Sequence, residues 1–174
     1  MISVAARFSQ QISKLNRFIG QSVAWCSLFL VLLVFTIAIM RYAFKLGSIS
    51  MQEVVIYLHG MIFMLGASYA MVDDEHVRVD VFYARLSKRR KAWINLAGCS
   101  LFLLPMCWFI FTNSFAYVAM SWQISESSSE SGGLPYLYLL KSLILIMPIL
   151  LALQSIAVIL QSFITIQTRP DADA

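Results

Sequence analysis

Few residues in this sequence could bind a metal ion, transfer a proton or act as a nucleophile. Within the long uncharged stretches, His59 is the only histidine, acid or base, while Glu53 and Lys141 lie near the ends of such stretches. The densest polar group is a short cluster that consists of Asp73, Asp74, Glu75, His76 and Asp80. Carboxylates are ligands that hard divalent cations prefer. The same acids can also neutralise neighbouring arginines at the edge of an apolar stretch, and we favour that interpretation over a metal site.

The cysteines and histidines do not form a cofactor site. Cys26, Cys99 and Cys107 all lie in apolar stretches without the spacing of metal ligands, so we interpret them as packing residues. A haem held inside a helical bundle needs two axial ligands that face each other. His59 has no second histidine in the apolar stretches, because His76 lies in a polar loop. The sequence therefore predicts no catalytic residue, no metal and no cofactor, and hence no enzyme.

The composition indicates a membrane protein. Of the 174 residues, 60% are hydrophobic and 13% are charged, whereas about 25% of residues are charged in an average soluble domain. A helix needs about 20 consecutive apolar residues to cross a bilayer. Four stretches satisfy this, and they predict spans at residues 18–42, 52–72, 92–120 and 138–165. Because a lone segment in lipid must satisfy its own backbone hydrogen bonds, all four are expected to be helices of one all-α membrane domain covering residues 1–174.

The basic residues predict the orientation. Ten lysines and arginines fall in the N-terminal segment, the connection between the second and third spans and the C-terminal tail, against three on the other side. By the positive-inside rule, both termini are expected in the cytoplasm. Because orientation explains the net charge of +4, no nucleic-acid partner is expected.

Two short amphipathic helices are expected at the membrane surface. One precedes the first span, where apolar residues recur at helical spacing, namely Phe8, Ile12, Leu15 and Ile19. The other lies between the second and third spans, where the same spacing is shown by Val79, Phe82, Tyr83 and Leu86. Their basic neighbours would face lipid headgroups. The segment 126–135 has two acids and several turn-forming residues, and it predicts an exposed loop on the outer side.

Several short motifs resemble one transporter family. They are Arg41-Tyr42, Met51-Gln-Glu-Val-Val-Ile-Tyr-Leu58, Gly66-Ala67, His76-Val-Arg-Val-Asp80 and Gly132-Gly-Leu-Pro135. Together they resemble the small membrane subunit, of the DctQ type, of tripartite ATP-independent periplasmic (TRAP) transporters. The resemblance implies an inner-membrane protein that braces a large membrane subunit, while that subunit takes an organic acid from a periplasmic binding protein and uses a sodium gradient. Membrane lipids are further expected partners.

The resemblance also indicates which residues matter. Those expected to serve folding or assembly are Arg41, Glu53, Gly66, His76, Arg78 and Asp80. Those that could help dock the periplasmic binding protein, because rim charges steer association, are Arg41, Lys45, Glu126 and Glu130. A faint likeness to the sialic-acid branch makes sialic acid the preferred substrate, ahead of dicarboxylates and keto acids.

Two other classes of function stay open at the level of sequence. A small channel or exporter could form from several copies of the chain, with a pore lined by Thr36, His59, Ser68 and Asn113. A membrane anchor for a redox enzyme would need a second haem ligand that the sequence does not offer. Isolation of the chain with its native partners would distinguish these classes from the transporter subunit.

Overall fold

The computed structural model describes residues 2–72 and 86–168, and all of its regular elements are helical. Within this part of the chain, four helical stretches are long and apolar enough to cross a membrane, namely Ala5–Ala43, Ile49–Val72, Lys88–Gln123 and Leu137–Thr168. This confirms the predicted all-α class and the four spans. The largest differences from the predicted ranges are at the ends, where helices continue past the uncharged stretches.

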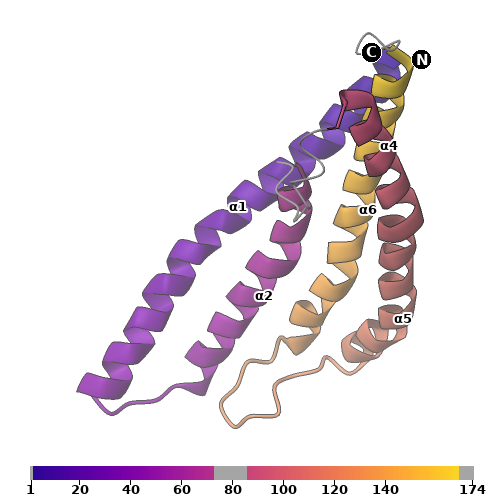
Figure 1. Cartoon of the computed structure of the whole chain (residues 1–174). Helices are drawn as coiled ribbons and strands as arrows, with labels where there is room; N and C mark the ends of the chain where they lie inside the picture. Colours follow the sequence, from indigo (N-terminus) through magenta and orange to yellow (C-terminus); the bar gives the residue numbers. More distant parts are fainter. Residues whose placement is uncertain (1, 73–85, 169–174) are drawn as a thin grey trace.

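The helices form a bundle around α6 (Leu137–Thr168). This helix contacts α1 (Ile2–Ala43), α2 (Ile49–Val72), α4 (Lys88–Gly98) and α5 (Leu104–Gln123). Figure 1 shows that α1 begins and α6 ends at the same end of the bundle, whereas the α1–α2 and α5–α6 connections lie at the opposite end. An even number of crossings requires this arrangement. That the first of these ends faces the cytoplasm stays a prediction from the charge distribution.

Helix α1 is continuous over 42 residues. The amphipathic segment expected before the first span is therefore the first part of α1 and not a separate helix, and its position at a membrane surface stays a prediction. Of its predicted apolar stripe, Ile12 is buried whereas Phe8 and Leu15 are about half exposed. The face that is buried instead carries Ser9, Ile12, Asn16, Gly20 and Val23.

Polar side chains join this buried face of α1 to α6. The Ser9 hydroxyl donates to the backbone carbonyl of Ala157 at 3.0 Å. The Asn16 amide donates to Gln154 Oε1 at 3.0 Å, and the Gln154 amide donates to the Ser13 hydroxyl at 3.3 Å. Asn16 is fully buried and Gln154 nearly so. In an apolar surrounding, such bonds favour one register between two helices, because sliding would leave polar groups unsatisfied.

A glycine allows α1 and α2 to approach closely. A methyl group on Gly20 would come closer than 3.0 Å to Tyr69 Cβ and Cγ, and would lie 2.9 Å from Tyr69 Cδ1. The same addition at Gly66 of α2, one of the expected motif residues, meets no atom of the described residues within 4 Å. Between these two glycines the close contact is therefore at Gly20, and none of the described residues fills the space at Gly66.

The third span contains a local change of helix type. Helix α4 begins after the Ser87 hydroxyl, which accepts a hydrogen bond from the Arg90 backbone and caps the helix. The next turn, η1 (Cys99–Leu103), is a π-helix, in which the Leu104 N–H reaches back to the Cys99 carbonyl. Pro105 lies two residues after this turn and cannot donate a backbone hydrogen bond, so the regular helical hydrogen-bond pattern is interrupted in the same region. Most of the short helix expected at residues 79–86 lies outside the described residues.

Candidate functional site

The best defined polar site joins the α5–α6 loop to the start of α2. One carboxylate oxygen of Glu53 accepts a hydrogen bond from the backbone N–H of Leu134 at 2.6 Å. The other accepts one from the Ser128 hydroxyl. The Ser50 hydroxyl, one helical turn before Glu53, donates to the carbonyl of Gly132. We call these contacts the Glu53 latch, and they bring together two of the sequence motifs that are about 80 residues apart.

Two glycines allow the loop to meet Glu53. Gly132 has φ +82°, which is in the left-handed region that favours glycine. A methyl group on Gly133 would lie 2.6 Å from Ser128 Cβ and 2.8 Å from Glu53 Oε1. The loop is closed by a backbone hydrogen bond from Ser128 to Leu134 at 3.0 Å and by one from Gly133 to Glu130 at 3.0 Å. The Gly132-Gly133 pair is thus required by the turn and by the close approach of the loop to the carboxylate.

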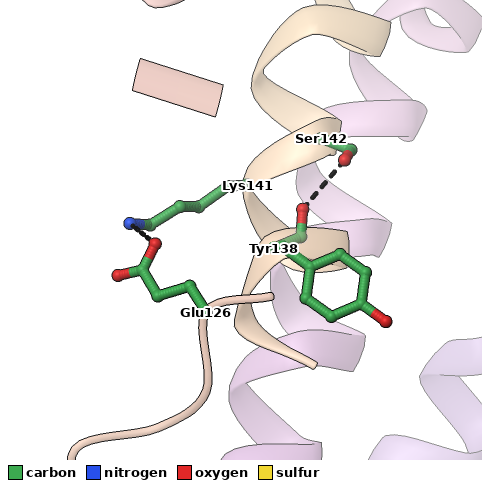
Figure 2. A network of polar contacts seen from close by, with 4 residues as sticks. All are labelled: Glu126, Tyr138, Lys141 and Ser142. Atoms are coloured by element: carbon green, nitrogen blue, oxygen red, sulfur yellow. Dashed lines mark hydrogen bonds and ion pairs between the residues drawn. The ribbon is translucent and has the colours of Figure 1, made fainter. Parts of the chain in front are cut away.

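A second set of contacts holds the same loop to α5 and α6. Lys141 of α6 pairs with Glu126 at 2.5 Å, and its ammonium group lies 4.1 Å from the centre of the Tyr117 ring. Figure 2 shows Lys141 extending from α6 towards Glu126, with Tyr138 and Ser142 on the same helix. The Trp122 indole donates to the Ser142 hydroxyl at 2.8 Å. The loop is therefore held by two sets of contacts, the Glu53 latch on α2 and the Glu126–Lys141 pair on α6.

The Glu126–Lys141 pair makes the loop sensitive to acid. The hydrogen bond from Lys141 lowers the pKa of Glu126 below its ordinary value of 4.5. A lowered pKa means that folding favours the ionised form, so the stabilisation is complete above about pH 5 and is lost as the pH falls through the lower folded-state pKa. We expect Glu126→Gln to lower the melting temperature at neutral pH, by an amount that decreases as the pH falls below the ordinary pKa of 4.5. Thermal unfolding of both proteins across this range measures it, and a difference independent of pH would contradict it.

The four residues expected to dock a periplasmic partner differ in how accessible they are in the structure. Arg41 and Lys45 line a cavity of about 330 Å³ beside the α1–α2 connection, and both are exposed. Glu130 is exposed on the α5–α6 loop. Glu126 is partly buried and forms an ion pair with Lys141. Three of the four thus present accessible charges at the end of the bundle that holds the helix connections.

Other residues singled out in the sequence are placed as follows. His76, Arg78 and Asp80 lie outside the described residues, as does the acidic cluster around them. His59 is exposed on the outside of α2. Thr36 and Asn113 are exposed, and each donates a hydrogen bond to its own helix backbone, while Ser68 is buried and does the same. The described part of the chain therefore does not gather these four polar residues into a common channel.

Several functional contacts were not predicted from the sequence. Ser128, Asn16 and Gln154 were not among the residues singled out in the sequence, and the structure places them in polar contacts. A possible signal was the occurrence of a carboxylate at the start of an apolar helix, since burial of a charge near lipid is costly unless it has partners. The partners themselves come from a distant loop and could not be identified.

This arrangement defines a multi-pass membrane protein with its polar contacts concentrated at the ends of the bundle. A model of the family described as "Tripartite ATP-independent periplasmic transporters, DctQ component" matches residues 30–165. The chain belongs to this family, and it is accordingly a component of a TRAP transporter of the bacterial inner membrane. No curated protein and no solved structure matches the chain.

Proposed function

We propose that this chain is an accessory, non-catalytic subunit that braces the large membrane subunit of a sodium-coupled transporter. The observation that carries the proposal is membership of the DctQ family over residues 30–165. The scarcity of ionisable residues within the four spans supports an accessory role, because ion and substrate pathways through a membrane usually contain such residues. A helix surface with open space at Gly66 is suited to close packing by a partner helix.

Isolation of the tagged chain from its native membrane in mild detergent tests this proposal. Mass spectrometry is expected to find a large polytopic membrane protein in a fixed ratio to the chain. Recovery with copies of itself alone would contradict the bracing role and favour a homo-oligomeric channel. A Gly66→Leu variant sharpens the experiment, since the first carbon of the added side chain meets no atom in the described part of the chain. We expect it to fold but to lose the large partner, with Gly98→Leu, a second glycine without near neighbours, as the matched control.

We further propose that the outer end of the bundle helps dock a periplasmic substrate-binding protein through Arg41, Lys45 and Glu130. Their exposure supports this role, and rim charges act chiefly on the rate of association. Reversal of all three charges is expected to reduce the association rate of the binding protein at low salt. A rate and salt dependence equal to those of the parent complex would exclude these residues from docking.

The transported solute is proposed to be an organic acid, with sialic acid as the first candidate. This rests on the resemblance of the sequence to that branch of the family. Uptake of labelled sialic acid by cells that carry the complete transporter, with and without a sodium gradient, tests both the substrate and the coupling ion. Sodium-dependent uptake of a dicarboxylate without uptake of sialic acid would show that the substrate is a dicarboxylate and not sialic acid.

A further inference from the structure

One side of α2 is exposed over residues 49–63. Ile49, Ile56 and Phe63 are 40%, 58% and 70% exposed. Gln52 and His59, which lie between them in the sequence, are exposed as well. Because the five positions follow each other at intervals of three or four residues, they form one stripe along the helix surface. We call this stripe the outer face of α2.

The opposite side of α2 is used within the bundle. It carries the fully buried Ser68 and also Gly60, where an added methyl group would lie 3.1 Å from the Leu140 side chain of α6. Helix α2 also contacts α1. The contacts with α1 and α6 therefore leave the outer face of α2 directed away from the described helices.

The outer face of α2 contains a polar side chain near the middle of the membrane. His59 lies close to the midpoint of α2, so it is far from both membrane surfaces. Thr36 of α1 and Asn113 of α5 are also exposed, but each donates a hydrogen bond to the backbone of its own helix. Within residues 2–72 and 86–168, His59 makes no hydrogen bond. Its imidazole therefore differs from the other exposed polar groups in having no partner in the described part of the chain.

An unpaired imidazole at this depth is costly if it faces lipid. Hydrocarbon offers no hydrogen-bond partner to a polar group. Ionisable side chains in transmembrane helices almost always face other protein or a water-filled cavity. The exposed surface of α1, by contrast, carries large apolar side chains that lipid solvates well, such as Phe29 and Phe35, which are 64% and 63% exposed. Of these two surfaces, the outer face of α2 is the one that calls for a protein neighbour.

We propose that the outer face of α2 packs against a transmembrane helix of the large membrane subunit, and that this helix supplies a hydrogen-bond partner to His59. The inference rests on the proposed bracing function and adds the surface through which it acts. The chain is one component of a tripartite transporter, so the proposed occupant is a helix of another component and not a second copy.

The spacing along the outer face of α2 also fits a neighbouring helix. Gln52, Ile56, His59 and Phe63 follow each other at intervals of four, three and four residues, which is the pattern of two helices that pack side by side at a small angle. Gly66 continues the stripe, and a methyl group there meets no atom of the described residues within 4 Å. Small residues of this kind let two helix backbones approach closely. The partner helix is expected to place a hydroxyl, amide or carboxylate group opposite the middle of α2.

Photo-cross-linking in the native membrane tests the position of the contact. The photoreactive amino acid benzoylphenylalanine takes the place of Phe63 on the outer face of α2. In a matched control it takes the place of Phe109 of α5, which is exposed to a similar extent, 65% against 70%. Isolation in mild detergent first establishes that each variant still assembles with the large subunit. We expect a cross-link to the large subunit from position 63 and none from position 109.

His59→Leu tests the hydrogen bond. Loss of a hydrogen bond between membrane helices is expected to weaken the association of the two subunits about three- to fifteen-fold. Energy transfer between labelled subunits in detergent measures this association. Thr36→Val is the matched control, because it removes an exposed polar group that bonds to its own helix, and it should leave the association unchanged. Circular dichroism of both variants establishes that the helices remain.

The outcomes separate this inference from the function on which it rests. A cross-link from position 63 to the large subunit, together with weaker association of His59→Leu, supports the proposal. Cross-links between two copies of the chain, or equal cross-linking from positions 63 and 109, would overturn it. An intact complex without a cross-link from position 63, or with His59→Leu binding as the parent does, would also overturn it but would leave the bracing function in place. Absence of a large subunit from the parent preparation would contradict the bracing function itself.

Discussion

Alanine in place of Gly20 is expected to separate α1 from α2 and to destabilise the bundle strongly. The added methyl group would overlap Cβ and Cγ of Tyr69. A rotation of the ring about χ2 moves neither of these atoms, so the overlap cannot be relieved in that way. Overpacking of this kind typically costs about 1–3 kcal/mol and sometimes more. Thermal unfolding of the purified chain in detergent, followed by circular dichroism or light scattering, measures the effect.

Gly66→Ala is the matched control for this prediction. It makes the same change in a neighbouring helix, but its methyl group meets no atom within 4 Å among residues 2–72 and 86–168. Alanine also favours a helix over glycine by about 1 kcal/mol. Gly66→Ala should therefore be neutral or stabilising in the isolated chain. Equal melting temperatures for the two variants would show that the contact between Gly20 and Tyr69 does not limit the packing of α1 and α2.

Glu53→Ala is expected to release the α5–α6 loop while leaving the four helices in place. Alanine removes both carboxylate oxygens, which accept from the Leu134 N–H and from the Ser128 hydroxyl. Hydrogen bonds to charged groups contribute about 1.5–3 kcal/mol. Hydrogen exchange at the amides of Leu134 and Ser128 should therefore accelerate roughly 10- to 100-fold, since 1.4 kcal/mol corresponds to a factor of ten.

Glu130→Ala provides the control within the same loop. Its carboxylate is exposed, and the contacts it makes in the loop use its backbone. Exchange at Leu134 should remain as in the parent protein. Slow exchange at Leu134 in Glu53→Ala, as in the parent, would show that the backbone hydrogen bonds of the loop hold it without the latch. If the released loop also weakens association of the proposed periplasmic partner, the latch orders part of the proposed docking surface.

The four spans could be predicted because a bilayer imposes a length and a composition on each helix. The arrangement of those helices could not be predicted in the same way. Lipid is as apolar as leucine, so an apolar residue gives no information on whether it faces lipid or another helix. Helix α6 illustrates this, because its sequence does not reveal that it contacts every other helix. In contrast, the polar residues Asn16 and Gln154 mark where α1 and α6 meet, but their pairing appears only in three dimensions.

The candidate site was predictable in part. Glu53 and the Gly132-Gly133 pair were recognised as motif residues, but their contact was not, since it depends on how the loop returns across the start of α2. The role of Gly20 was also missed, because a single glycine in an apolar helix does not reveal which side chain will approach it. Glu126 was expected to be an accessible charge, and only the position of Lys141, one turn into α6, shows that it is paired.

The central position of α6 has a consequence for how the protein is made. Of the described helices, α1 and α2 contact each other directly, whereas α4 and α5 have their main contacts with other helices through α6. Among the described helices, α6 is synthesised after the others. Until that helix enters the membrane, the third span has no substantial docking site within the described chain, and Lys141 cannot pair with Glu126. Without α6, the first two spans would form a hairpin and the third would lack its main contacts among the described helices, so synthesis of α6 is the step that brings these helices together.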